Sequence, residues 1–290
     1  MRDFMIATDS NMELSPETIA ELGLTVAPMP FEMDGKAYAN YPDGREMDAK
    51  EFYKLLREGK TASTSQLNEA TFTEYFESIL KQDKDLLYIG FSSGLSGTYY
   101  QGTLAADALR QKYPNAKIIT VDSLSASVGE GLLVYMAAKM KSDGKTIEEV
   151  AKWVEDNRLH VCHWFTVDDL NHLKRGGRVS PAAALVGTML GIKPVLKVDD
   201  SGKLIPVAKV RGRQKALEAL VDEMEKSAIN PAEQIVFISQ ADCLDDALKV
   251  QEMIKNRLHV KEFMINMIGP VIGSHAGPGT LALMYLGNHR

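Results

Sequence analysis

A strand that passes into a helix through glycine and serine constrains the fold of this chain more than any other stretch. The apolar run Leu86-Leu87-Tyr88-Ile89 predicts a buried strand, and residues 98–112 have the periodicity of a helix. Between them, residues 90–97 contain three serines and three glycines. Free backbone N–H groups at such a helix start form a cradle for an anion, although the same residues also suit an ordinary turn between a strand and a helix.

The first half of the chain alternates strands with helices. We expect strands at residues 4–8, 25–30, 86–89 and 117–121, a hairpin at 31–38, and helices at 49–58, 69–81, 98–112, 131–141 and 146–157. This alternation predicts a mostly parallel sheet that binds ligands at the carboxyl ends of its strands. Three of these ends carry hydroxyl groups, at Ser10, at Ser92, Ser93 and Ser96, and at Ser123. A further run of hydroxyl residues, 61–66, precedes a helix.

The pattern changes from about residue 161. We expect helices at 168–173, 181–190, 214–227 and 244–256, and strands at 192–198, 204–210, 235–239, 262–268 and 281–286. The strands 192–198 and 204–210 are joined by a tight turn, which predicts an antiparallel hairpin. A chain of 290 residues exceeds the usual size of one domain. We therefore expect an α/β fold of two domains: residues 1–161 with a parallel sheet, and residues 162–290 of α+β type with a mixed sheet.

Charge is unevenly distributed along the chain. The net charge of −6 argues against broad binding of nucleic acid, yet residues 171–215 contain ten Lys and Arg against two acidic residues. Such a basic region suggests a phosphate group, an acidic partner or an anionic membrane surface, or a solvated face. No apolar run suits a signal peptide or a membrane span, so we expect a cytoplasmic protein. Cys162 and Cys243 match no metal or redox spacing, and we expect no metal site.

Two local patterns suggest chemistry. The sequence Gly90-Phe91-Ser92-Ser93-Gly94 fits the nucleophile elbow of a hydrolase, and His275 with Asp122 or Asp242 would complete a triad in the order Ser, Asp, His. Short Gly/Ser turns match this pattern often, and no matching oxyanion loop lies upstream. His275 lies among glycines and prolines, in an expected loop whose shape favours presenting a side chain over filling a core.

Several motifs, in order along nearly the whole chain, resemble those of the DegV family. They are Thr64-Ser65-Gln66, Ser92-Ser93-Gly94-Leu95-Ser96-Gly97-Thr98-Tyr99, Asp122-Ser123, Leu173-Lys174-Arg175-Gly176-Gly177-Arg178-Val179, Lys193-Pro194-Val195-Leu196, Lys209-Val210-Arg211 and the residues Gly269-Pro270 and Gly273-Ser274-His275-Ala276-Gly277-Pro278-Gly279. The resemblance implies two α/β domains, the first of three layers, with a long-chain fatty acid bound between them. It also implies a carrier rather than an enzyme, which presents the carboxyl group to a separate fatty acid kinase for phospholipid synthesis in bacteria.

The resemblance also implies the site residues. The carboxylate-binding threonine of the family falls on Thr64, its serine on Ser96 or Ser93, with Ser96 preferred, and its histidine on His275. The supporting loops contain Ser65, Gln66, Gly94, Gly97, Ser274 and Gly277. Leu67-Asn68 after the threonine motif departs from the Pro-Ser that the family often has, and this changes the local turn.

Hydroxyl donors suit a carboxylate because they avoid the cost of burying a permanent charge, and histidine adds a donor that can be neutral or charged. We therefore expect Thr64, Ser96 and His275 to converge, and the acyl tail to enter an apolar tunnel at the junction of the two halves. Candidate residues for docking the kinase are Arg175, Arg178, Arg211 and Arg213, which we expect on one exposed face. No cofactor is expected besides the bound fatty acid. An acyl hydrolase and a scaffold protein that carries no lipid are the alternatives.

Overall fold

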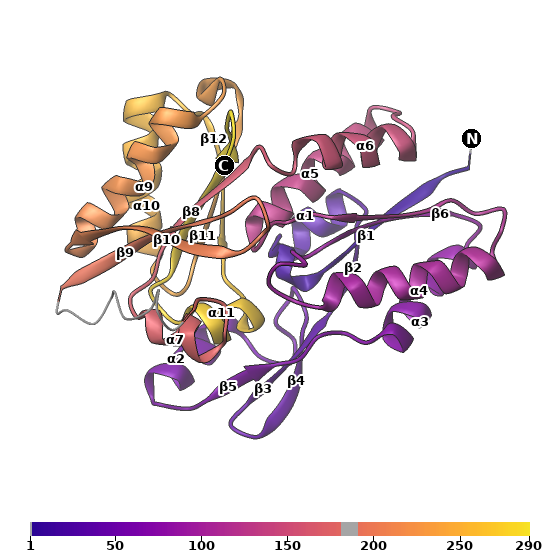
Figure 1. Ribbon diagram of the computed structural model, residues 1–290, viewed down its shortest axis with the longest axis horizontal. Helices are drawn as coiled ribbons and strands as arrows, with labels where there is room; N and C mark the ends of the chain where they lie inside the picture. The colour runs from indigo at the N-terminus through magenta and orange to yellow at the C-terminus, as the bar shows by residue number, and fades with distance from the viewer. Residues whose placement is uncertain (1, 181–190) are drawn as a thin grey trace.

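The computed structural model describes residues 2–180 and 191–290 (Figure 1). The helix that the sequence predicts at residues 181–190 lies outside the described residues. No described helix has the length and apolar character needed to cross a membrane. The strands within the described ranges form three sheets, one of four strands, one of six and one of three.

The four-stranded sheet is parallel throughout, as the alternation of strands and helices predicts. Its strands lie in the order β2-β1-β6-β7, with the bounds Thr25–Ala27, Phe4–Asp9, Asp85–Gly90 and Ile118–Asp122. The carboxyl ends of β1, β6 and β7 therefore meet at one edge. Asp9 joins two of these ends, because its buried carboxyl group accepts a hydrogen bond from the backbone N–H of Phe91.

Helices cover both faces of this sheet, so the N-terminal part has three layers. On one side lie α3 (Glu69–Leu80) and α4 (Thr98–Lys112), and on the other α5 (Val128–Ser142) and α6 (Ile147–Asn157). The alternation of β6 separates the two cores: Leu86 and Tyr88 belong to the cluster with α3 and α4, and Leu87 and Ile89 to the cluster with α5 and α6. Helix α6 begins with a capping box, in which the Thr146 hydroxyl group accepts from the backbone N–H of Glu149 and the Glu149 side chain accepts from that of Thr146.

The three-stranded antiparallel sheet differs from the sequence-based prediction at two points. Its order is β4-β3-β5, with the bounds Lys36–Asn40, Met29–Met33 and Ala62–Thr64. The strand predicted at 25–30 is in fact two strands, which separate at Pro28 and enter different sheets. The hydroxyl-rich segment 61–66 contains the strand β5, which pairs Thr64 with Phe31. The hairpin predicted at 31–38 is confirmed.

The six-stranded sheet is mixed, as predicted for the second half. Its order is β10-β9-β8-β13-β11-β12, with the bounds Leu204–Arg211, Ile192–Val198, Val161–Thr166, Leu281–Leu286, Ile235–Gln240 and Glu262–Met267. The pair β11 and β12 is parallel and the other pairs are antiparallel. Helices α9 (Arg213–Ser227) and α10 (Leu244–Leu258) pack on the outer face, and α5 packs on β8, β11 and β13 (Figure 1). Helix α5 thus lies between the two large sheets.

The short elements between the sheets complete the fold. They are α1 (Pro16–Glu21), α2 (Ala49–Arg57), α7 (Leu170–Arg175), α11 (Pro270–Ala276) and the short 3-10 helices Ser10–Met12 and Pro231–Glu233. Helix α11 contacts α2, α7, β3 and β5. The glycine-rich segment 269–279 was expected as a loop, and this was wrong for its first part: Pro270 begins the helix α11, because proline suits the first helical position.

Candidate functional site

A cavity lies where the loops of the parallel sheet meet the mixed sheet. Its volume open to the centres of water-sized molecules is about 180 Å³. The polar residues of its wall include Thr64, Ser96, Arg178 and His275. Most of the rest is apolar: Met29, Phe91, Leu95, Phe165, Leu173, Val198, Leu204, Ile268, Val271, Ile272, Ala282 and Met284. The wall combines residues from both halves of the chain, and clefts of this kind are common ligand sites.

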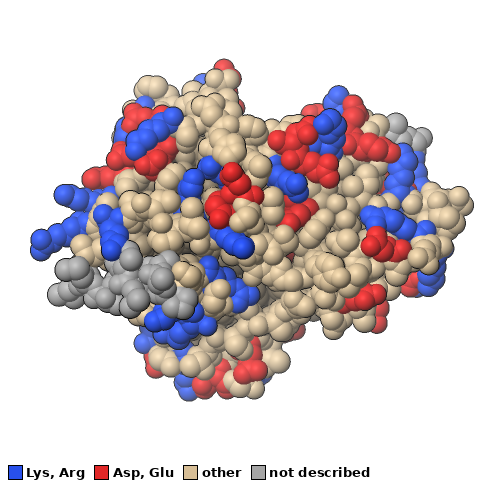
Figure 2. Space-filling model, in the orientation of Figure 1, with Lys and Arg blue, Asp and Glu red and all other residues tan. Residues whose placement is uncertain are grey.

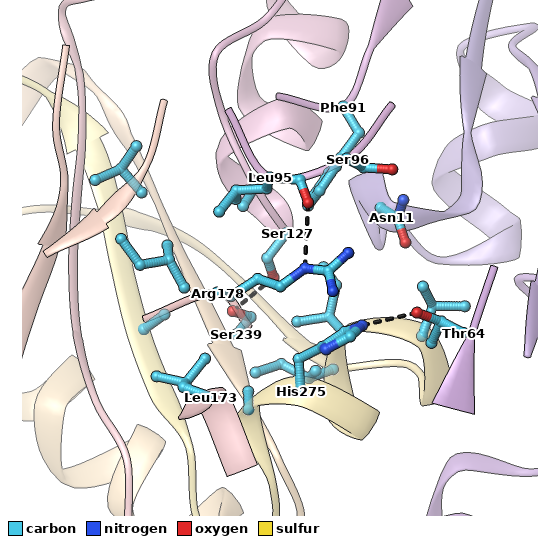
Figure 3. Close-up of a pocket in the computed structure, with 18 of the residues that line it drawn as sticks. Asn11, Thr64, Phe91, Leu95, Ser96, Ser127, Leu173, Arg178, Ser239 and His275 are labelled. Atoms are coloured by element: carbon cyan, nitrogen blue, oxygen red, sulfur yellow. Dashed lines mark hydrogen bonds between the residues drawn. The ribbon is translucent and has the colours of Figure 1, made fainter. Parts of the chain in front are cut away.

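Two of the predicted site residues touch each other. The hydroxyl group of Thr64 lies 2.7 Å from Nε2 of His275, although 211 positions separate the two residues in the sequence (Figure 3). Thr64 is the last residue of β5, and His275 lies in the last turn of α11. The packing of α11 on β5 brings the two side chains together. Thr64 and His275 therefore lie side by side, as expected.

His275 is held in a buried position with one ring nitrogen unused. Its Nδ1 is buried and has no hydrogen-bond partner among the described residues. A Cβ atom built at Gly176 would overlap this nitrogen, so only glycine leaves room for the ring there. Burial, and then the positive charge of Arg178, lower the pKa of His275 to about 4. The imidazole is therefore neutral at neutral pH, and the charge of the site resides elsewhere.

Arg178 supplies that charge, which corrects the expectation that it lies on an exposed docking face. Its side chain is half-buried and lines the cavity. Nε donates to the carbonyl oxygen of Leu95 at 3.2 Å (Figure 3). Nη1 donates to the carbonyl oxygen of Gly176. Nη2 has no hydrogen-bond partner among residues 2–180 and 191–290. The Gly-Gly-Arg turn after α7 signals this residue in the sequence, but its inward direction depends on tertiary packing.

Of the two serines considered for the site, Ser96 lines the cavity and Ser93 does not. The Ser96 hydroxyl group lies 2.9 Å from that of Thr98, at the start of α4. Ser93 is exposed, and its backbone N–H donates to Asp122 at 3.2 Å. The preference for Ser96 over Ser93 therefore agrees with the geometry.

The supporting residues divide into two groups. Ser65, Gln66 and Gly97 line the cavity, whereas Gly94, Ser274 and Gly277 do not. Gly94 packs against the turn at Gly202, where a Cβ atom would overlap backbone. Ser274 donates to the carbonyl oxygen of Pro270, and Gly277 has a φ of 78° beside the ring of His172. The latter three therefore shape the loops around the site.

The geometry does not support the hydrolase alternative. The Ser92 hydroxyl group is buried and donates to the carbonyl oxygen of Gly202 at 2.8 Å. His275, the proposed base, contacts Thr64 instead. A nucleophilic serine requires a base within hydrogen-bond reach, and Ser92 has no such partner among the described residues. Ser92 instead joins the loop after β6 to the β9–β10 turn.

The remaining arginines differ in their exposure. Arg175 and Arg211 are exposed, and Arg211 makes no ion pair with a described residue. Arg213 is only partly exposed and pairs with Asp246 at 2.8 Å and Asp168 at 3.6 Å, so its expected place on an exposed docking face was wrong. Figure 2 shows Lys and Arg side chains gathered on the part of the surface that carries α7, β9 and β10. Among the described residues, no group of three or more His, Cys, Asp or Glu could hold a metal ion.

Known proteins resemble this chain over its whole length. Residues 3–288 match the family described as "Uncharacterised protein, DegV family". A DegV domain-containing protein of Clostridium perfringens is 47% identical over 288 residues, which cover 99% of each chain. A solved structure described as showing fatty acid binding of a DegV family protein from Thermus thermophilus has 30% identity and a TM-score of 0.86, and covers 99% of this chain and 100% of that one. A structure of a DegV lipid-binding protein from Thermotoga maritima has 28% identity and a TM-score of 0.88, with 99% of both chains covered. The fold, the motifs and these similarities together place the chain in the DegV family.

Proposed function

We propose that this protein binds a long-chain fatty acid in the cavity, with the carboxylate held by Thr64, His275 and Arg178 close to Ser96. The observation that carries this proposal is the composition of the cavity wall, which joins one cluster of donors to an otherwise largely apolar surface. Two similar solved structures are described as lipid-binding or fatty-acid-binding, which supports the same ligand class.

The donors match the chemistry of a carboxylate. Arg178 provides a permanent positive charge whose Nη2 is not used by any described residue, and a guanidinium group pairs with the two oxygens of a carboxylate. Thr64 and the neutral His275 hydrogen-bond each other, so one of their two polar hydrogens is left to donate to the carboxylate, without a second buried charge. Each methylene group of the tail that leaves water for the apolar wall contributes about 0.8 kcal/mol.

We also propose that the protein presents this carboxyl group to a separate fatty acid kinase, which forms the acyl phosphate for phospholipid synthesis in the bacterial cytoplasm. The protein then acts as a carrier, and the chemistry belongs to the kinase. Arg175 and Arg211 are the remaining docking candidates, because both are exposed, at the ends of α7 and β10. An anionic membrane surface is a second possible contact for the same charges.

Native mass spectrometry of the purified protein tests the ligand. We expect a bound mass in the range of long-chain fatty acids, which organic extraction removes and added fatty acid restores. Protein that contains no lipid and takes up none would contradict the proposal.

The docking part is tested separately with Arg211→Glu. This variant should bind fatty acid normally, while acyl-phosphate formation with the kinase falls steeply, since the reversed charge repels an acidic partner. Lys261→Glu, the same change of charge at an exposed position just before β12, is a control for a general charge effect. Unchanged turnover with Arg211→Glu would remove this residue from the docking site.

A further inference from the structure

The floor of the cavity contains polar side chains beyond the carboxylate donors. The register of the mixed sheet places Ser239 opposite Ala282, and Ala282 opposite Phe165, so these three residues share one row and one face. The next row on this face pairs Met284 with His163. All five residues line the cavity. Ser239 and His163 thus place polar groups on two successive rows, in which the other side chains, Phe165, Ala282 and Met284, are apolar.

These rows lead away from the carboxylate donors. Thr280, Ala282 and Met284 alternate along the chain and all line the cavity. The Thr280 hydroxyl group lies 2.9 Å from the carbonyl oxygens of both Ala276 and Gly277, so this end of the floor adjoins α11 and His275. The row of Ser239 lies one two-residue step further, about 7 Å along the strand. A chain anchored at His275 therefore reaches Ser239 only after several carbon atoms.

Ser239 ends a buried chain of hydrogen bonds. Its hydroxyl group lies 2.9 Å from that of Ser127, which in turn hydrogen-bonds the carboxyl group of Glu13 (Figure 3 shows the two serines). Ser127 has a single hydroxyl proton, so it can donate to only one of these two neighbours. The direction of the whole chain therefore depends on whether Glu13 carries a proton.

The protonated form of Glu13 leaves one donor facing the cavity. Burial raises the pKa of Glu13 to about 8, so its carboxyl group is protonated at neutral pH. Glu13 then donates to Ser127, and Ser127 donates to Ser239. The hydroxyl hydrogen of Ser239 is left without an acceptor among the described residues. His163 does not accept it, because its Nε2 accepts from the backbone N–H of Ala126 and its Nδ1 lies 2.9 Å from the carbonyl oxygen of Val161.

An unsubstituted acyl chain would leave that hydrogen against methylene groups, which is unfavourable for a buried donor. Resting on the proposed function, we infer that the cavity selects fatty acids that carry an oxygen atom within the chain, as a hydroxyl or a keto group, at the level of Ser239. Either group is an acceptor for the Ser239 hydroxyl, and a hydroxyl can also donate back to the Ser239 oxygen.

Competition binding tests this inference. A fluorescent fatty acid is displaced with octadecanoic acid and with its hydroxy and keto derivatives, whose oxygen is moved stepwise along the chain. We expect derivatives oxygenated near mid-chain to bind about tenfold more tightly than octadecanoic acid, and those oxygenated near the methyl end to show no advantage. Comparison of hydroxy with keto derivatives shows whether the in-chain group must also donate.

The variant Ser239→Ala removes the hydroxyl group and should lose the preference for oxygenated chains. Octadecanoic acid should bind to it at least as tightly as to the unaltered protein, because no buried donor is left unpaired. The measurement on the unaltered protein does not depend on the folding of this variant. Equal or tighter binding of octadecanoic acid by the unaltered protein, or a preference that persists in Ser239→Ala, would overturn the inference and leave fatty acid binding in place. Failure of all these acids to bind would overturn the proposed function as well.

Discussion

At the scale of single residues, the site combines one permanent positive charge, on Arg178, with neutral hydrogen-bond donors. Arg178 is charged at any physiological pH, whereas His275 is neutral because burial and Arg178 lower its pKa to about 4. Two charged groups side by side would repel each other in the empty cavity. A carboxylate placed between them would favour protonation of His275, so fatty acid binding and proton uptake by this ring are coupled.

Arg178→Gln tests the role of the charge. Loss of a charge-assisted hydrogen bond should weaken fatty acid binding by about 1.5–3 kcal/mol, which corresponds to a factor of roughly ten to one hundred. Titration calorimetry with a soluble fatty acid measures the change. The matched control is Lys174→Gln, which removes an exposed charge from the same turn and should bind as the unaltered protein does. If both variants lose affinity equally, the effect is one of net charge and Arg178 does not contact the ligand.

At the scale of secondary-structure elements, two short helices and one short strand build the carboxylate site. Helix α11 contacts both α7 and β5. Helix α7 ends at Gly176, against which the ring of His275 packs, and β5 ends at Thr64. None of these elements is long enough to be stable alone, so their positions depend on packing. The ring of His275 is positioned by the end of α7 and by Thr64 together.

Gly176→Ala tests this arrangement. Gly176 has a negative φ that alanine adopts freely, so the added methyl group acts through its overlap with Nδ1 of His275. We expect His275 to be displaced from Thr64 and fatty acid affinity to fall by about 1–3 kcal/mol, the loss of a buried hydrogen bond. A crystal structure of the variant shows the ring position directly.

The neighbouring residue provides the control for Gly176→Ala. Gly177 has a φ of 70°, and a methyl group added there would point into open space. Gly177→Ala should therefore cost about 1–2 kcal/mol of folding stability through backbone strain, with fatty acid affinity unchanged. A Gly176→Ala variant that binds normally would show that the ring can shift without loss.

At the scale of the whole molecule, one buried carboxyl group links the two halves. The side chain of Glu13 accepts from the backbone N–H of Gly269 at 2.7 Å, and its backbone carbonyl accepts from Asn266 at 2.6 Å. Its carboxyl group also bonds Ser127, which reaches Ser239 on β11. This set of contacts crosses the boundary that we propose between residues 161 and 162. Glu13 therefore helps to hold together the two halves of the chain that enclose the cavity.

The raised pKa of Glu13 makes the stability of the fold depend on pH. The folded protein keeps the proton up to about pH 8, whereas the unfolded chain releases it near 4.5. The stabilising effect is thus complete below the unfolded value and is lost as pH rises from about 4.5 through about 8. Burial also raises the pKa of Asp9, to about 6, and that of Glu130, and both changes act in the same direction.

Glu13→Gln should flatten this dependence, because the amide cannot ionise but keeps the acceptor for Gly269. Denaturant unfolding at a series of pH values measures the free energy of unfolding. The variant should lose less stability than the unaltered protein as pH rises from about 6 to about 8. Glu58→Gln, at an exposed position, should leave the slope unchanged. Parallel slopes for Glu13→Gln and the unaltered protein would show that Glu13 ionises normally in the fold.

Most of the longer elements, and the family, can be predicted from the sequence alone. Alternating apolar runs predicted the parallel sheet, helix α4 has the predicted bounds, and the two hairpins form as expected. The ordered motifs indicated the DegV family and the residues Thr64 and His275. These features depend on local periodicity and on neighbouring residues, which a sequence displays directly.

The assembly of the site depends on tertiary packing instead. Its central contact joins Thr64 to His275 across 211 positions, a separation that no local pattern encodes. Strand β5 has only three residues and forms because β3 offers it a pairing edge, so its hydroxyl-rich sequence does not identify it. The inward direction of Arg178 follows from carbonyl groups on two different loops. A polar side chain hydrogen-bonds the partner that the fold places next to it. For this site, those partners come together only when the two halves of the chain pack.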